Sequence, residues 1–240
     1  SLFQQDTIGL FFDRLRKEKP VHYCRESHVG PFWSITKFDD IMAVDTNHKV
    51  FSSEAKLGGI AIQDMHSVEG ALELEMFIAM DPPKHDQQRK AVTPAVAPSN
   101  LLLLEPTIRE RACQILDDLP IGEEFDWVDK VSIELTTMTL ATLFDFPWEE
   151  RRKLTRWSDV TTAAPETGIV ASYEARREEL IECAMYFKGL WDQRVNEPPR
   201  NDLISIMAHS PVTKDMPFLE FLGNLLLLIV GGNDTTRNSI

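Results

Sequence analysis

The sequence has few cysteines and no long hydrophobic run. Its three cysteines, Cys24, Cys113 and Cys183, are odd in number and widely spaced. This usage argues against a disulfide framework, fits a reducing compartment and offers no metal-site spacing. The longest apolar run, residues 225–232, is far shorter than the roughly 18 residues that a membrane-spanning helix needs. The first residues also lack the basic segment and apolar run of a secretory signal, so we expect a cytoplasmic protein without a transmembrane segment.

Positive charge is scarce as well. The chain carries 25 Lys and Arg against 38 Asp and Glu, a formal net charge of -13. A surface this acidic repels the phosphates of nucleic acids and the head groups of anionic membranes, so neither is an expected partner. Repeats, linkers and low-complexity stretches are missing too, and 43% of the residues are hydrophobic. We expect residues 1–240 to form a single domain with a sizeable core.

The N-terminal part mixes helix and strand. Residues 6–18 have the pattern of an amphipathic helix, and residues 21–23 and 32–36 read as two short strands joined by a turn. Asp39 is the expected N-cap of the next helix. Residues 50–80 hold no steady period, and a loop of this length inside a compact domain is usually a lid or a binding wall.

Helical periodicity dominates the rest of the chain. From residue 82 onward, apolar residues recur at spacings of three and four, which is the period of a helix that buries one face. Helices are predicted over residues 82–96, 99–117, 130–145, 148–162, 172–195 and 216–240. The fold class is therefore mainly α, with a small β-sheet near the N-terminus.

The first chemical motif lies at residues 81–90. Asp81 can cap a helix whose first turn contains two prolines. His85 and Arg89 are four residues apart, so they share a helix face, close to the end of the helix that favours anions. Together they could bind a carboxylate or a phosphate. The alternative is a solvated basic turn in which Arg89 pairs with Asp86 or another acid.

The second motif closes a strongly apolar segment, residues 218–236. Helices that are apolar on nearly all sides are buried, yet this one ends in two glycines followed by Asn, Asp and Thr, which are weak helix formers. Gly231 and Gly232 would let a flat ligand approach the backbone, and Asp234 beside Thr235 could hold water and relay protons. The alternative is an ordinary helix end in which one of the glycines is a left-handed cap.

Taken together, the two motifs resemble those of the cytochrome P450 family of heme-thiolate monooxygenases. The run Asp81-Pro82-Pro83-Lys84-His85 followed by Arg89 is similar to the bacterial signature of helix C. The run Gly231-Gly232-Asn233-Asp234-Thr235-Thr236 is similar to the signature of helix I, and the separation of the two runs suits the family. The resemblance extends over residues 8–240 and implies the N-terminal part of a P450 fold, ending in the long central helix I.

The resemblance also implies roles for individual residues. His85 and Arg89 would contact the heme propionates, while Gly231 and Gly232 would leave room for oxygen and substrate. Thr235 would hydrogen-bond the oxygen being activated or its water, and Asp234 would feed protons to it. The activity implied is the insertion of one oxygen atom from O2 into an unactivated C–H bond.

Two stretches point to a particular branch of the family. Residues 57–62 and 75–80 are similar to the bacterial enzymes that hydroxylate medium-chain alkanes and related aliphatic chains at the terminal carbon. The resemblance then implies a small apolar substrate, O2, and electrons from a ferredoxin and its reductase. Lys84 and Lys90 are candidates for a basic docking patch, and residues 157–171 are expected to form a second mobile wall of the pocket.

The sequence departs from the family in one respect. It contains neither the later Glu and Arg pair nor the cysteine loop whose thiolate binds the heme iron. None of the three cysteines has the family's setting for that ligand, and each is expected to be a buried small hydrophobe. We interpret the sequence as a piece of a longer enzyme. The alternative is a non-enzymatic helical module that binds an apolar ligand or a partner helix beside residues 218–232.

Overall fold

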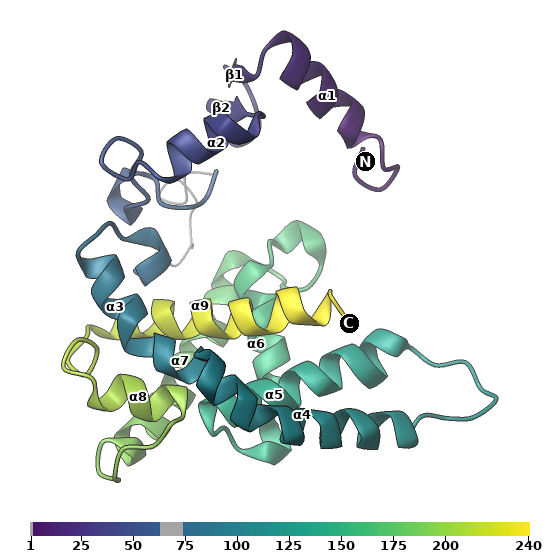
Figure 1. Cartoon of the computed structure of the whole chain (residues 1–240), viewed down its shortest axis with the longest axis vertical. Helices are drawn as coiled ribbons and strands as arrows, with labels where there is room; N and C mark the ends of the chain where they lie inside the picture. The colour runs from purple at the N-terminus through teal and green to yellow at the C-terminus, as the bar shows by residue number, and fades with distance from the viewer. Residues whose placement is uncertain (1, 63–73) are drawn as a thin grey trace. The chain divides into compact units, whose positions relative to one another are not determined.

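The structure is a computed structural model that describes residues 2–62 and 74–240 (Figure 1). The chain divides into two compact units. Unit 1 comprises Ser1–Val68 and Ile78–Asp81, and unit 2 comprises Glu69–Phe77 and Pro82–Ile240. Compact units of this kind can belong to one domain, so the single domain stays a prediction.

Unit 1 contains the mixed elements expected from the sequence. They are α1 (Ile8–Glu18), β1 (Val21–Cys24), β2 (Phe32–Ile35), α2 (Phe38–Asp45) and the short 3-10 turn Ala55–Leu57. The two strands pair in an antiparallel register that joins Val21 to Ile35 and Cys24 to Phe32. The predicted cap was wrong: Lys37 is the N-cap of α2, and Asp39 lies within the first turn. Part of the predicted lid falls on residues 63–73, outside the described residues.

Unit 2 is helical. Its longer elements are α3 (Lys84–Val92), α4 (Pro98–Asp117), α5 (Glu134–Phe144), α6 (Arg152–Thr162), α7 (Tyr173–Arg194), α8 (Leu203–His209) and α9 (Phe218–Arg237). Shorter turns of unit 2 are the 3-10 segments Thr93–Val96, Trp148–Glu150 and Pro165–Thr167 and the π-helical segment Val128–Ile133, whereas the 3-10 segment Phe77–Ala79 begins in unit 2 and ends in unit 1. The sequence analysis missed α8, which begins where the Asp202 carboxylate accepts a hydrogen bond of 2.8 Å from the Ser205 amide. The mainly α fold with one small sheet is confirmed.

Helix α9 is the centre of unit 2. It packs against α5 and α6, and in Figure 1 it runs from the end of the unit that holds α3 and α8 to the opposite end. Its apolar face is fully buried through Leu222, Leu225, Leu226 and Ile229. The helix was predicted to be central because its sequence is apolar on nearly all sides, and the burial of this face agrees.

The helix continues through both glycines of its polar ending. Gly231 and Gly232 lie inside α9, which extends to Arg237, and neither has a positive φ. The alternative of a left-handed glycine cap is therefore wrong. Two glycines inside a helix cost roughly 0.8–1 kcal/mol each relative to alanine, so tertiary packing on α5 and α6 has to offset this cost.

The segment predicted as a second mobile wall begins in the core. Trp157 is only 3% exposed and its ring packs against those of Phe146, Tyr186 and Phe187, at centroid distances of 6.1, 5.6 and 5.8 Å. This residue belongs to the largest hydrophobic cluster of unit 2, so the prediction was wrong for it.

The connection between α6 and α7 is held at both ends by arginines. Arg176 of α7 donates to the carbonyls of Val160 and Thr161 at the end of α6, at 3.0 and 2.5 Å. Arg156 of α6 donates to the Ile169 carbonyl at 3.2 Å and forms an ion pair with Glu179 of α7 at 2.6 Å. Hydrogen bonds to the carbonyls therefore close the last turn of α6 and fix the loop that follows it.

The cysteines differ from one another in burial. Cys183 is buried, and burial raises the pKa of its thiol well above the usual value. Cys24 is half-buried and Cys113 is exposed, so the prediction of a buried role was wrong for Cys113.

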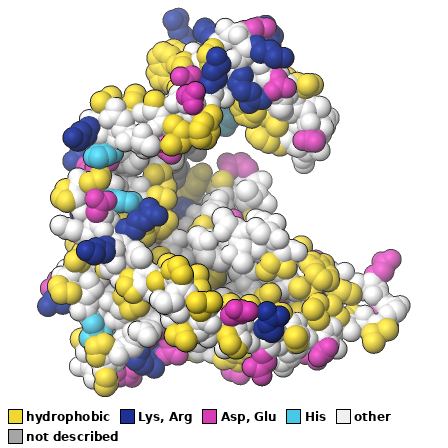
Figure 2. Space-filling view, viewed as in Figure 1, with side chains coloured by type: hydrophobic (Ala, Val, Ile, Leu, Met, Phe, Trp, Pro, Cys, Tyr) yellow, Lys and Arg dark blue, Asp and Glu magenta, His cyan; other side chains and the backbone are white. Residues whose placement is uncertain are grey.

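Large hydrophobic side chains lie at the surface of both units, and Figure 2 shows many of them on the face in view. No helix among the described residues combines the length and apolarity needed to cross a bilayer.

Candidate functional site

Helix α3 begins later than its sequence suggests. Its N-cap is Pro83, and Asp81 is not a cap. The Asp81 carboxylate instead accepts hydrogen bonds from the Ser52 hydroxyl at 2.6 Å and the Ser53 amide at 3.2 Å. The Ser52 hydrogen bond is the main reason that the pKa of Asp81 is lowered. The acid of this motif thus organises the loop of unit 1 to which it belongs.

One face of α3 is joined to the first half of α9 by buried polar groups. The Lys84 ammonium forms an ion pair with Glu220 at 2.8 Å, and Gln88 donates to the same carboxylate. Asn224 donates to the Gln88 side-chain oxygen at 2.8 Å. Gln88, Glu220 and Asn224 are 3%, 4% and 2% exposed, so this network is shielded from water and each hydrogen bond in it counts for more than at the surface. Lys84 is therefore engaged in the fold, which argues against its role in a docking patch.

His85 and Arg89 lie on the neighbouring face of α3. His85 is half-buried, and its Nδ1 lies 2.7 Å from the Phe77 carbonyl oxygen. The Arg89 side chain is exposed, and no hydrogen bond or ion pair of its guanidinium is found within the described part of the chain. The alternative in which Arg89 pairs with Asp86 is not formed. Within the described ranges, one nitrogen of His85 and the guanidinium of Arg89 therefore remain free to meet an anion.

Helix geometry places the α3 contact and the glycine motif on the same stripe of α9. With 3.6 residues per turn, Glu220, Leu228, Gly231 and Thr235 all lie within about 40° of Asn224 around the helix axis. Exposure increases along this stripe, from buried Glu220 and Asn224 through half-buried Leu228 to exposed Gly231 and Thr235. A Cβ added at Gly231 would meet nothing within 4 Å. The stripe that anchors α3 thus continues as an open surface about 10 Å further along the helix, seven residues on.

The remaining motif residues flank this open stripe. On one side, a Cβ at Gly232 would lie 3.3 Å from the Leu140 side chain of α5, so this glycine permits close helix packing. On the other side, Asp234 pairs with Arg237, which also pairs with Asp159 of α6 at 2.8 Å. Burial lowers the pKa of Arg237, but the two carboxylates outweigh burial and the net shift is upward. Asp234 is therefore held as one of two partners of a single cation.

The hydroxyl of Thr235 has a defined role within the helix. It donates to the Gly231 carbonyl at 2.9 Å. Because its only proton is committed to that carbonyl, the oxygen lone pairs remain as acceptors on the exposed side of the helix. Thr235 can accordingly accept a hydrogen bond from a water molecule or a ligand lying on the open stripe.

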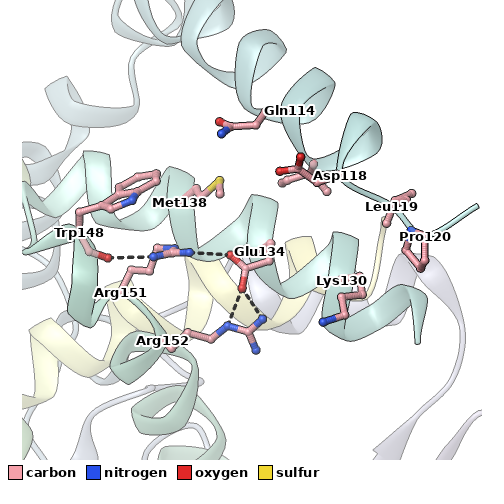
Figure 3. A pocket seen from close by; sticks show the side chains of 11 residues that line it. Gln114, Asp118, Leu119, Pro120, Lys130, Glu134, Met138, Trp148, Arg151 and Arg152 are labelled. Carbon is pink, nitrogen blue, oxygen red and sulfur yellow. Dashed lines mark hydrogen bonds and ion pairs between the residues drawn. The ribbon is translucent and has the colours of Figure 1, made fainter. Parts of the chain in front are cut away.

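Two cavities lie away from this stripe. The larger, about 450 Å³, is bounded by α4, α5 and α6, and Figure 3 shows that Glu134, Arg151 and Arg152 on its wall already pair with one another. Glu134 binds Arg151 at 3.0 Å and also Arg152, and Arg152 binds Asp129 at 2.8 Å. The smaller cavity, about 250 Å³, is lined mainly by apolar side chains of α5 and by Gly232 and Thr236. Gly232 is the one predicted site residue that lines either cavity, since His85, Arg89, Gly231, Asp234 and Thr235 line neither of these two.

Sequence reasoning missed the residues that connect the two motifs. Asn224 and Glu220 are polar positions inside the most apolar helix of the chain, and their spacing of four was the signal that could have found them. Gly223 is equally informative, since a Cβ there would lie 2.0 Å from the Glu75 carbonyl oxygen. No group of three or more His, Cys, Asp or Glu suited to a metal occurs among the described residues. His85 and Arg89 are the basic groups of this site that could hold an anionic group of a ligand.

Comparisons with known proteins agree on one family. No family model matches the chain. The linalool 8-monooxygenase of Pseudomonas putida is 33% identical over 246 residues, covering 100% of this chain and 60% of that protein. Cytochrome P450-153 from Novosphingobium aromaticivorans is 42% identical, with a TM-score of 0.86, over 98% of this chain and 58% of that one. CYP153D17 from Sphingomonas sp. PAMC 26605 is 45% identical, with a TM-score of 0.88, over 99% of this chain and 59% of that one. The chain thus spans somewhat more than half the length of the proteins that it matches.

Proposed function

Since this chain belongs to the cytochrome P450 family, we propose that the full-length protein is a heme-dependent monooxygenase. It inserts one oxygen atom from O2 into an unactivated C–H bond, and its substrates are medium-chain alkanes or related aliphatic chains attacked at the terminal carbon. The axial cysteine would come from sequence outside these 240 residues. A ferredoxin and a ferredoxin reductase are the proposed electron donors.

The observation that carries this proposal is the shared stripe of α9. Heme is a flat, largely apolar group with two carboxylates at one edge. Among the residues that the structure describes, α3 offers His85, whose Nδ1 is bound to Phe77 but whose Nε2 has no partner, and Arg89, whose guanidinium has none, while the surface of α9 opens at Gly231. Any larger side chain at position 231 would project from that surface and would keep a flat ligand away from the helix backbone. The residues present therefore fit heme, and the bound group would supply the activation of O2.

The residues of the chain would each contribute a simple task. Arg89 would bind one carboxylate with its two parallel N–H donors, and His85 would donate from Nε2 to a carboxylate. Thr235, whose proton is held by Gly231, would accept a hydrogen bond from a water or a protonated oxygen on the open stripe. Asp234 would hold the proton that reaches this water, once its carboxylate leaves Arg237.

The half-buried leucines of α9 support an aliphatic substrate. Leu227 and Leu228 lie one turn before Gly231 and are partly exposed toward the same side of the helix. An apolar surface of this kind excludes water and binds a hydrocarbon chain without demanding a polar group from it. The resemblance of residues 57–62 and 75–80 to terminal alkane hydroxylases points in the same direction.

The experiment uses the full-length protein expressed with heme. Reduction under carbon monoxide should give the shifted Soret band of a thiolate-ligated heme, and octane with a ferredoxin system should yield 1-octanol. A colourless protein, or a heme without the thiolate band, would overturn the proposal. The double variant His85→Ala and Arg89→Ala should lose heme on gel filtration, whereas Lys90→Ala, a neighbouring cation on α3, should keep it.

A further inference from the structure

The segment just before α3 is fixed to α9 by its backbone. The Glu75 carbonyl lies against Gly223, where a Cβ would come within 2.0 Å of the oxygen. At the next residue of the helix, the Asn224 side-chain oxygen accepts a hydrogen bond of 2.8 Å from the Phe77 amide. Asn224 is 2% exposed, so this bond is shielded from competing water. Residues 75–77 are thereby held in one position on α9.

The position of Phe77 decides how His85 can bind an anion. A carbonyl oxygen only accepts, so the contact of 2.7 Å means that His85 Nδ1 carries a proton and donates it to Phe77. The other nitrogen, Nε2, then bears a proton only in the cationic ring. Toward a carboxylate, His85 must therefore act as an imidazolium whose orientation is set by the Phe77 carbonyl. The ring edge of Phe77 lies beside the imidazole as well, at a centroid distance of 6.2 Å.

We propose that Asn224 is the positioning residue for His85, acting through the backbone of Phe77. Asn224 accepts from the amide of Phe77, and the carbonyl of the same residue accepts from His85. The second arm of Asn224, its hydrogen bond to Gln88, connects the Asn224–Phe77 pair to α3 itself. The first half of α9 thus sets both the place of His85 and the ring proton that His85 presents. This inference rests on the proposed binding of heme carboxylates by His85.

The charged groups around His85 are consistent with a cationic ring. On α3 they are Lys84, Asp86 and Arg89, and on the facing segment and on α9 they are Glu75 and Glu220. Lys84 is paired with both glutamates, at 3.6 and 2.8 Å, so the three groups together retain one negative charge. Asp86 and Arg89 flank the histidine with opposite charges. Among the described residues, the Phe77 carbonyl is the hydrogen-bond partner of the ring.

The test compares a substitution that removes both arms of Asn224 with one that removes only its bond to α3. In the full-length, heme-loaded protein, Asn224→Leu removes the bonds to Phe77 and to Gln88, and Gln88→Met removes the bond between Asn224 and α3 while leaving Phe77 held. We expect transfer of heme to an excess of apomyoglobin to become about tenfold faster with Asn224→Leu and to change much less with Gln88→Met. Equal rates for the two variants would contradict the proposal.

A third variant keeps the contact to Phe77 and reverses the rest of the network. The double substitution Glu220→Gln with Asn224→Asp retains an oxygen acceptor for the Phe77 amide, conserves net charge and lets Gln88 bridge in the opposite sense. It should retain heme as the wild type does. If it loses heme as fast as Asn224→Leu, the network as a whole matters and not the contact to Phe77.

Nitrogen-15 NMR of histidine-labelled protein supplies a readout that a merely structural role would not move. The His85 ring should show two protonated nitrogens in the heme-loaded wild type, and its Nδ1 signal should shift in Asn224→Leu but not in Gln88→Met. A neutral ring in the loaded wild type would overturn the inference. Failure of the proposed function looks different, because the wild type itself would then bind no thiolate-ligated heme.

Discussion

The close approach of Glu75 to α9 gives a prediction with a defined size. In Gly223→Ala, the new Cβ would lie 2.0 Å from the Glu75 carbonyl oxygen, whereas real Cβ atoms keep at least 3.0 Å. The segment and the helix would have to separate by about 1 Å. The neighbouring bond between Asn224 and the Phe77 amide, now 2.8 Å, would then exceed the length of a hydrogen bond.

The cost follows from two terms that oppose one smaller gain. Forced overpacking costs about 1–3 kcal/mol, and a buried amide left without its partner costs about 1–3 kcal/mol. Alanine is a better helix former than glycine by about 0.8–1 kcal/mol, which offsets part of this. We expect Gly223→Ala to lower the free energy of unfolding by about 2–4 kcal/mol, because the clashing atom belongs to the backbone and cannot rotate away.

The matched control is the glycine on the open part of the same stripe. Nothing lies within 4 Å of a Cβ at Gly231, so Gly231→Ala should leave the chain as stable or gain about 0.8–1 kcal/mol. Urea unfolding of the two variants, followed by far-UV circular dichroism, measures both effects. If Gly223→Ala were as stable as Gly231→Ala, residues 75–77 would not rest on α9, and the reasoning would be refuted.

Three further predictions follow from other contacts. In the full-length enzyme, Thr235→Ala should raise the peroxide formed per reductant consumed, because the acceptor on the open stripe is lost, and unchanged coupling would remove that role from Thr235. Arg156→Ala removes the ion pair with Glu179 and should speed limited proteolysis between α6 and α7, with no effect expected on cleavage elsewhere. Ser52→Ala should raise the pKa of Asp81 toward its usual value in a carboxyl NMR titration. A carboxyl group whose pKa is lowered in the folded state stabilises the fold at pH values above its unfolded pKa, and this stabilisation is lost as the pH falls. The wild type should therefore lose more stability below about pH 4 than Ser52→Ala does.

Local patterns were sufficient for most helices and for the small sheet. The apolar spacing of three and four marked α4, α6, α7 and α9 to within a few residues, and α6, α7 and α9 each bury one continuous face, whereas α4 buries only Ile115. Patterns were insufficient where a residue had a long-range partner. Asp81 looked like a helix cap, but Ser52, twenty-nine residues earlier, takes its carboxylate. Short α8 carried too few residues to show a period, although Asp202 ahead of it was a usable signal.

The candidate site shows the same division. Spacing of four placed His85 with Arg89 on α3, and motif order placed Gly231 with Thr235 on α9. The two pairs could not be related to each other from sequence, since their relation depends on hydrogen bonds between α3 and α9. Asn224 carries that relation, and its spacing of four from Glu220 marked a polar contact on this helix without showing that the partner is α3.

The same helix, α9, carries both the residues that anchor α3 and the open glycine segment. The number of residues between Asn224 and Gly231 is therefore constrained more strictly than their identity. Inserting one residue between Asn224 and Gly231 would turn the second site by about 100° relative to the first, toward a flank that α5 or α6 already occupies. Deleting one would turn it equally far the other way. Exchanging one leucine between them for another apolar residue would leave that phase intact. Between Asn224 and Gly231, α9 should therefore tolerate many apolar substitutions but almost no insertion or deletion.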